Sequence, residues 1–341
     1  MSSTSNPMGR IPYIDALRGF AIVLVVLGHT IQYSAKNFDD LPLFRIIYAF
    51  HMPLFMFISG FVYHHEARNP WPFLRKKFLT LVLPFLSWLL ISFLWFNPIT
   101  ASHAVEFLVG VIKSPDAGGL WFLWVLFLIN VVMAFSQAIA PGRAALGALC
   151  FFVAMNALVV AAPSANVLGL GLLCWHLLFF LIGHVWAQKL PGSAPSITVS
   201  VISALTFAVL VTIWQRSGNN IIEGYFLHLP HIALAILLRG NNYATALCAI
   251  VALMGFFRVI AEEFGANFTK LRFLGSITLE IYATHIYFLS AALWLTSLYS
   301  ISLLPQTILA FGGALVGALF LQASIKKIPA LALLMFGRHS S

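Results

Sequence analysis

The sequence predicts an all-α, polytopic membrane protein. Of the 341 residues, 61% are apolar and only 9% are charged, whereas soluble domains carry roughly 25% charged residues. The mean hydropathy is +0.94, so lipid must solvate most of the surface. Inside lipid each backbone polar group needs an internal partner, which leaves helices or a closed barrel. The apolar stretches run to about twenty residues instead of alternating over about ten, and this favours helices.

Ten stretches are predicted to cross the membrane. They cover residues 14–34, 45–63, 77–95, 120–139, 144–162, 167–187, 196–214, 243–261, 274–296 and 303–323. Residues 216–242 interrupt this pattern with charged and imidazole side chains. For this segment an external loop, a re-entrant hairpin and an eleventh span all stay open. The first stretch contains Asp15 and Arg18 and lacks a small-residue cleavage site, so it is interpreted as a retained helix and not as a signal peptide.

The basic residues predict that both termini lie in the cytoplasm. With ten spans, thirteen Lys and Arg residues face the cytoplasm and five face outward, with Arg18 inside the first span. An eleventh span would move the basic residues of segments 270–272 and 326–327 to the outside. The net charge of +9 is therefore explained by membrane topology, and nucleic acid is not an expected partner.

One transmembrane domain is expected over residues 14–325, between a short polar tail over 1–13 and a short basic tail over 326–341. The sequence contains no repeat of fixed period and no soluble domain, so chemistry is expected within the helix bundle or at its faces. The cysteines lie in apolar stretches without a CxxC pair, and we expect them to be small buried side chains: Cys150, Cys174 and Cys248.

The first predicted span carries polar groups that lipid disfavours. An Arg or Asp near the centre of a membrane helix costs about 2.5–3.5 kcal/mol, yet this span contains Asp15, Arg18 and His29. Arg18 and His29 share a helix face, because eleven residues make about three turns plus 20°, or about 16 Å along the axis. Asp15 lies one turn before Arg18 and can pair with it. The pattern favours a functional site, and a snorkelling arginine with a packed histidine is the alternative.

Three further features each allow a functional and a structural interpretation. His51, in the second span, could orient His29 or bond the backbone freed by Pro53. Three consecutive cations follow that span, at positions 75–77. They could hold the phosphates of a nucleotide-bearing donor or anchor the loop at the inner membrane surface. Trp121 could stack on a sugar ring or belong to the interfacial aromatic belt.

The ninth span contains another acid and another imidazole. Glu280 and His285 are separated by about 140° around the helix, so they do not share a face. His176 and His184, in the sixth span, are expected to be packed or interfacial. Two histidine pairs invite a metal interpretation, but neither has accompanying ligands, and no metal is expected: His64–His65 and His228/His231.

Several of these residues together resemble the acyltransferase-3 family of integral-membrane acyltransferases, which includes bacterial glycan O-acetylases. The resemblance lies in the Arg-x10-His spacing of Arg18 and His29, in the run Pro53–Phe61, in Leu120–Leu123, and in Leu279 through His285. These motifs lie in order from residue 15 to residue 285. The length and the ten spans agree with this family as well.

The resemblance implies an enzyme that moves an acetyl group from cytoplasmic acetyl-CoA to a sugar hydroxyl of a cell-surface or lipid-linked glycan. It implies a multi-pass protein of the inner (cytoplasmic) membrane, in contact with membrane lipids. The catalytic set implied is His29 with Arg18, Asp15 and Glu280, and Arg18 would also help to bind the donor.

The resemblance also implies a donor site after the second span. Many family members carry an Arg-x-x-Arg there, but in this chain Arg75 is followed three residues later by Phe78. The donor site is therefore assigned to Arg75, Lys76 and Lys77. Acceptor binding is assigned to three other residues, which are His51, Trp121 and His285.

The imidazole of His29 could deprotonate the sugar hydroxyl or carry the acyl group itself. A transporter that uses the same polar residues as a relay is the alternative function, although the sequence lacks the repeated halves that many transporters show. A structural subunit that uses these groups only for helix packing is a third hypothesis.

Overall fold

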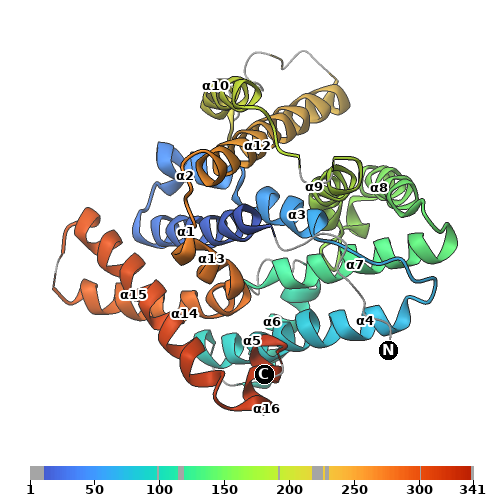
Figure 1. The fold of residues 1–341 in the computed structure, drawn as a ribbon. Helices are drawn as coiled ribbons and strands as arrows, with labels where there is room; N and C mark the ends of the chain where they lie inside the picture. Colours follow the sequence, from blue (N-terminus) through green and yellow to red (C-terminus); the bar gives the residue numbers. More distant parts are fainter. Residues whose placement is uncertain are drawn as a thin grey trace. The chain divides into compact units, whose positions relative to one another are not determined.

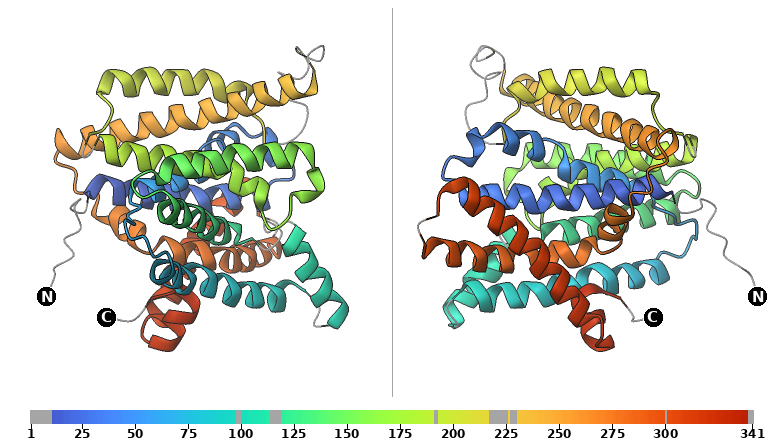
Figure 2. Two further views of the ribbon diagram at one scale, coloured as in Figure 1. Left: turned by 90° about the vertical axis from the view of Figure 1, so that its right-hand side faces the viewer. Right: turned by 60° about the vertical axis from the view of Figure 1, so that its left-hand side comes forward.

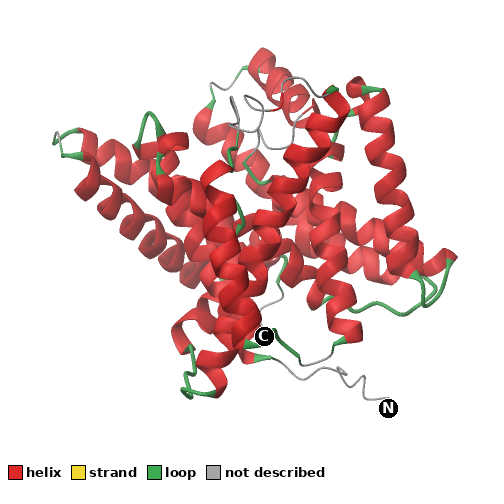
Figure 3. Ribbon diagram, turned by 90° about the horizontal axis from the view of Figure 1, so that it is seen from above, coloured by secondary structure: helices red, strands yellow, loops and turns green. Residues whose placement is uncertain are grey.

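The computed structural model describes residues 11–97, 100–113, 119–190, 193–216, 226, 230–299 and 301–338. Every regular element among them is helical (Figure 3). Eight helical segments in this part of the chain are long and apolar enough to cross a membrane. The predicted all-α membrane fold is therefore confirmed.

The described residues form two compact units. The first unit comprises residues 1–58 and 187–318, and the second comprises residues 59–186 and 319–341. Figure 1 labels the helices of both units. The boundaries between the units fall inside three helices, α3, α9 and α15.

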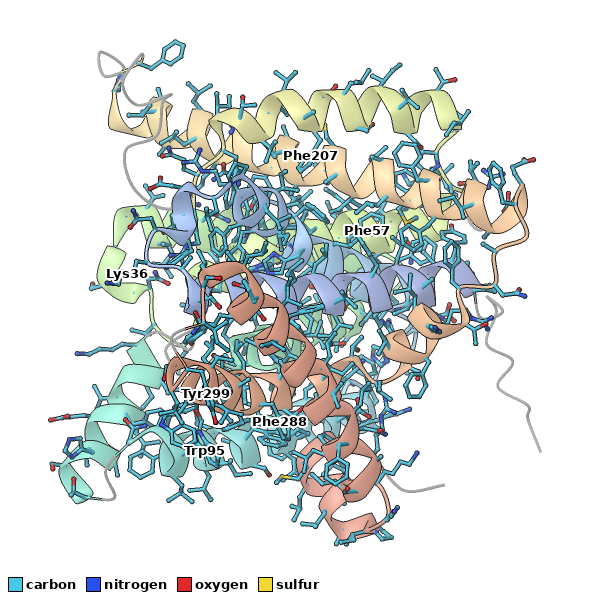
Figure 4. The ribbon with its side chains drawn as sticks, turned by 90° about the vertical axis from the view of Figure 1, so that its left-hand side faces the viewer. Lys36, Phe57, Trp95, Phe207, Phe288 and Tyr299 are labelled. Carbon is cyan, nitrogen blue, oxygen red and sulfur yellow. The ribbon has the colours of Figure 1, made fainter. Side chains whose placement is uncertain are left out.

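Nine of the described elements lie in the first unit, and two of these continue into the second unit. They are α1 (Pro12–Ser34), η1 (Phe38–Asp40), α2 (Pro42–Tyr48), α3 (His51–Phe61), α10 (Ile197–Ile213), α12 (His231–Glu262), α13 (Thr269–Ser276), α14 (Thr278–Ser297) and α15 (Leu303–Ile325). Helix α1 packs against α13 and α14, and α10 lies along α12 (Figure 2). Phe207 of α10, labelled in Figure 4, packs against Phe50 with 5.7 Å between ring centroids.

Small residues bring α14 and α15 together in the first unit. Phe288 of α14, also labelled in Figure 4, lies directly over Gly317, where a Cβ atom would overlap its ring. One turn earlier, Gly313 lies beside Ala292. Helices in lipid associate through such small-residue faces because van der Waals packing, and not hydrophobic burial, holds them together.

The second unit holds the remaining elements. They are α4 (Trp71–Lys77), the π-helical turn Phe78–Val82, α5 (Leu83–Phe96), α6 (Ala101–Lys113), α7 (Trp121–Ile139), α8 (Ala144–Ala161), η4 (Pro163–Ala165), α9 (Leu170–Lys189) and α16 (Pro329–Phe336). Helix α4, the π turn and α5 run on as one apolar segment. The π turn lies where Pro84, which has no N–H, cannot donate to the carbonyl of Thr80.

All ten predicted spans coincide with helical segments. Two of these, α10 and α14, are not among the eight long apolar helices. Helix α10 has only 17 residues, and α14 carries a buried polar face. The span predicted over 243–261 is only part of α12, which begins at His231 because residues 232–238 are apolar and favour helix. The second half of the ambiguous segment is thus helical, whereas residues 217–225 and 227–229 lie outside the described part.

Of the described helices, four lie mostly or wholly outside the predicted spans: α4, α6, α13 and α16. Helix α6 is amphipathic, and its exposed apolar residues follow the i, i+3, i+4, i+7 pattern of one helix face: Val105, Leu108, Val109 and Ile112. Such a helix can lie in the membrane interface. The expectation for the cysteines is wrong for Cys150, which is exposed on α8, and holds for Cys174, which is buried. A lipid-facing helix exposes apolar side chains that a soluble core would bury.

Candidate active site

Helix α1 carries the two residues of the Arg-x10-His spacing. It is continuous from Pro12 to Ser34, so Arg18 and His29 lie on one face, about 16 Å apart along the axis. Both side chains are half-buried. The two polar side chains therefore lie about three helical turns apart on the same face of α1.

The Arg18 end of α1 is held by a close crossing with α13. A Cβ atom on Gly19 would overlap the carbonyl oxygen of Leu271, and a Cβ atom on Gly275 would overlap that of Asp15. Only glycine permits the two backbones to approach so closely. The crossing explains why glycine directly follows Arg18 in the sequence.

Three imidazoles gather at the C-terminal end of α1. His285 of α14 lies 5.3 Å from His29 between ring centroids, with the rings inclined at 37°. His51, the first residue of α3, lies 4.7 Å from the ring of Tyr48, and that ring is 6.3 Å from His29. Helices α1, α3 and α14 thus bring together three residues that the sequence singled out separately.

Backbone hydrogen bonds determine the tautomers of two of these rings. Nδ1 of His51 is 2.8 Å from the carbonyl oxygen of Ile47. Nδ1 of His285 is 3.0 Å from the carbonyl of Ile281 and 2.9 Å from that of Tyr282. Since a carbonyl oxygen can only accept, Nδ1 is the donor in each ring, and Nε2 of the neutral ring carries a lone pair.

Two residues that the sequence reasoning missed complete the cluster. The Tyr48 hydroxyl donates to Oε1 of Gln32 at 2.5 Å and lies 3.5 Å from Nδ1 of His29. The ring of Tyr48 stacks on Phe44, with 3.9 Å between centroids. Gln32 lies one turn after His29, so a search for polar residues on that face would have found it. Tyr48 shows no such pattern, because it comes from another helix.

Glu280 lies on α14 and is 1% exposed. Thr284, one turn later, donates its hydroxyl to the Glu280 carbonyl at 2.7 Å. Glu280 and His285 are both buried although they point in different directions around α14. Asp15 is half-buried at the start of α1.

A basic and aromatic groove lies in the second unit. Its volume is 980 Å³. Arg75 and Lys76 line it together with residues of α4, the π turn and α7, among them Trp71, Phe78, Phe127 and Phe135. Both cations are exposed. Such a groove can accept an anionic group on its cations and an aromatic or apolar group on its walls.

The other predicted residues of the second unit lie elsewhere. Lys77 does not line the groove. Its Nζ lies over the ring of Phe73, 5.3 Å from the centroid. Trp121 is half-buried at the start of α7 and contacts His176, with 4.9 Å between ring centroids. Trp121 therefore belongs to a different unit from His51 and His285, the two residues with which the sequence analysis grouped it.

Within the described ranges there is no group of three or more His, Cys, Asp or Glu side chains that could hold a metal ion. His65 stacks on Phe73 with 4.4 Å between centroids. Burial, and then the neighbouring His64, lower the pKa of His65 below its ordinary value. His228 and the side chain of His231 lie outside the described part of the chain.

Comparison with known proteins places this arrangement in a family. Residues 11–323 match the acyltransferase-3 family, described as "Acyltransferase domain". The chain belongs to this acyltransferase family. As an acyltransferase with apolar helices of this kind, it is a membrane enzyme, and the family gives no support to the transporter hypothesis.

Two curated relatives of this acyltransferase are both called nodulation protein NolL. The protein from Sinorhizobium fredii (strain NBRC 101917 / NGR234) is 27% identical over 294 residues, which cover 79% of this chain and 75% of the relative. The protein from Mesorhizobium japonicum (strain LMG 29417 / CECT 9101 / MAFF 303099) is 27% identical over 195 residues, covering 52% and 48%. No solved structure matches this acyltransferase.

Proposed function

We propose that this acyltransferase moves an acetyl group from acetyl-CoA to a sugar hydroxyl of a cell-surface or lipid-linked glycan. The cluster around His29 is the observation that carries the proposal. A half-buried imidazole on a membrane helix has a tyrosine hydroxyl and a second imidazole beside it. Intramembrane ionisable groups that lie together in this way mark functional sites.

In this proposal His29 takes the proton of the sugar hydroxyl. The O–H bond breaks, a bond forms between that oxygen and the acyl carbon, and the C–S bond of the thioester breaks. The proton then passes from His29 to the departing sulfur, so that atoms and charge balance. His29 is a base here, and transient acylation of the same ring is the alternative route. Tyr48, whose hydroxyl donates to Gln32, lies 3.5 Å from Nδ1 of His29 and helps to hold the ring in position.

The donor would be held through its phosphates by the cations of the second unit. The groove fits such a group, because Arg75 and Lys76 supply positive charge and Trp71 and Phe135 supply aromatic surface. The donor itself supplies an acyl carbon activated as a thioester. Lys77, which packs on Phe73, supports the positive field near this loop.

Roles for the remaining predicted residues follow from their chemistry. Arg18 and Asp15 set the charge at the α13 crossing, Arg18 also contributes to donor binding, and Glu280 provides a buried acid on α14. His51 contributes to acceptor binding in the first unit, and Trp121 offers an aromatic surface for a sugar ring in the second. We further propose an inner-membrane location with both termini in the cytoplasm, because that topology concentrates the basic loops on the side where acetyl-CoA is found.

The test uses purified full-length protein in nanodiscs with acetyl-CoA that carries a labelled acetyl group. Release of the CoA thiol and transfer of label to glycans extracted from the same cells are measured together. Mass spectrometry of surface glycans from cells with and without the gene should show the loss of an acetyl increment. Unchanged glycans together with no thiol release would overturn the proposed function.

A further inference from the structure

His285 has a hydrogen-bonding arrangement that the mechanism above does not use. The ring is 3% exposed, on α14. Its Nδ1 lies within hydrogen-bond distance of two backbone carbonyls, those of Ile281 and Tyr282. Both carbonyls can only accept, so the proton of the neutral ring is on Nδ1 and a lone pair is on Nε2.

That lone pair is buried and unsatisfied. Nε2 of His285 has no hydrogen-bond partner among the described residues. A buried acceptor without a donor is destabilising, and unsatisfied groups of this kind call for an explanation. The nearest imidazole is His29, at 5.3 Å between ring centroids. A ring-to-ring N–H···N bond has a centroid separation of about 5 Å, the two ring radii added to a normal donor–acceptor distance.

The Tyr48 hydroxyl lies beside Nδ1 of His29. The Tyr48 hydroxyl donates to Gln32, so it can only accept from His29 Nδ1. Nδ1 of His29 thus lies near the Tyr48 oxygen, and the unpartnered Nε2 of His285 belongs to the imidazole that is 5.3 Å from His29 between ring centroids. An imidazole has two ring nitrogens, so His29 can donate a hydrogen bond from one and take a proton on the other.

We propose that His285 is a positioning residue whose Nε2 accepts a hydrogen bond from one nitrogen of His29 while the other nitrogen of His29 takes the hydroxyl proton. This inference rests on the proposed function. The positive charge that His29 acquires is then shared by two rings instead of standing alone inside the membrane. His285 gains no net proton during the cycle, because the proton passes on from His29 to the sulfur. The role is distinct from acceptor binding, which the sequence analysis assigned to this residue.

Two amide substitutions separate this role from a structural one. His285→Asn places an amide N–H near the position of Nδ1, so it keeps the bond to the carbonyls and removes the Nε2 acceptor. His285→Gln places its amide near the position of Nε2 and loses the Nδ1 bond. Both variants are purified in nanodiscs and compared for thermal unfolding, for kcat and for the KM of acetyl-CoA.

We expect H285N to unfold near the wild-type temperature. Its kcat should fall roughly tenfold to hundredfold, because one hydrogen bond to a charged group is lost. The KM of acetyl-CoA should change little. H285Q should retain more of kcat than H285N while unfolding at a lower temperature. The reverse order, with an active H285N and an inactive H285Q, would show that only the Nδ1 bond matters and would overturn the proposal.

A second measurement does not depend on turnover. The ¹⁵N spectrum of histidine-labelled wild-type protein, with the His285 signals identified by their loss in H285N, reports which nitrogen carries the proton. A neutral ring protonated on Nδ1 supports the proposal, and a proton on Nε2 contradicts it. If the wild-type protein has the Nδ1-protonated tautomer but releases no CoA thiol, the proposed acetyl transfer is contradicted, whereas the tautomer assignment is not.

Discussion

The imidazole cluster of the first unit and the groove of the second unit differ in how far their polar side chains are exposed. The cluster is assembled from buried or half-buried rings whose hydrogen bonds are internal, and His51 and His285 are 4% and 3% exposed. The groove is open, and its cations Arg75 and Lys76 are exposed. Buried groups can be held in one geometry, which proton transfer requires. Exposed cations can capture a phosphate without the cost of burying charge.

This contrast predicts different kinetic effects for changes in the two units. A change in the cluster should act mainly on kcat, because it affects the reacting atoms. A change in the groove should act mainly on the KM of the donor.

The largest effect is expected for His29→Ala, which removes the proposed base. We expect kcat for acetyl transfer to fall by roughly 10²–10⁴-fold, the usual contribution of general acid–base catalysis. His103→Ala is the matched control, because this histidine is exposed on α6 in the second unit and its ring bonds to Thr100. Turnover close to wild type in H29A would remove His29 from the mechanism.

The double substitution Arg75→Ala, Lys76→Ala should raise the KM of acetyl-CoA by roughly tenfold to hundredfold, with a smaller change in kcat. Two charge-assisted hydrogen bonds to phosphate would be lost. Lys113→Ala, at the end of α6, controls for a general loss of positive charge. A loss of kcat at saturating donor, with KM unaltered, would contradict the assignment of the groove to donor binding.

Gly19→Ala should destabilise the first unit by about 1–3 kcal/mol, because overpacking forces the crossing of α1 and α13 apart. The thermal unfolding midpoint in detergent measures this effect. Gly312→Ala is the control, since a Cβ atom at Gly312 would meet nothing within 4 Å. Equal midpoints for the two variants would mean that the close crossing is not needed for stability.

The smallest effect is expected for Tyr48→Phe. It removes the hydrogen bond to Gln32 and should lower kcat by roughly fivefold, the worth of about 1 kcal/mol for a neutral hydrogen bond. Tyr33→Phe serves as the comparison, because the exposed Tyr33 lies 6.4 Å from His29 between ring centroids. If Y33F and Y48F reduce kcat equally, the Tyr48–Gln32 pair has no special part in positioning His29.

Most of the fold could be predicted from the sequence because the signal for a membrane helix lies in its own stretch of residues. An apolar run of sufficient length has to be helical in lipid, whatever surrounds it. The errors lie where a local signal was weak or misleading: the start of α12, the amphipathic α6, and the exposed Cys150. In each case the prediction assumed that an apolar residue is buried or that an apolar stretch is a separate full span. A membrane protein can also expose apolar side chains to lipid on its outer surface.

The sequence by itself determined the helical membrane fold and the shared face of Arg18 and His29, since both follow from the periodicity of a single helix. It could not determine that His285 lies beside His29, or that Tyr48 and Gln32 meet between α1 and α2. Those contacts join residues of different helices, so the periodicity of a single helix does not predict them. The tautomers of His51 and His285 were likewise decided only by the tertiary structure, through the carbonyls that each Nδ1 faces.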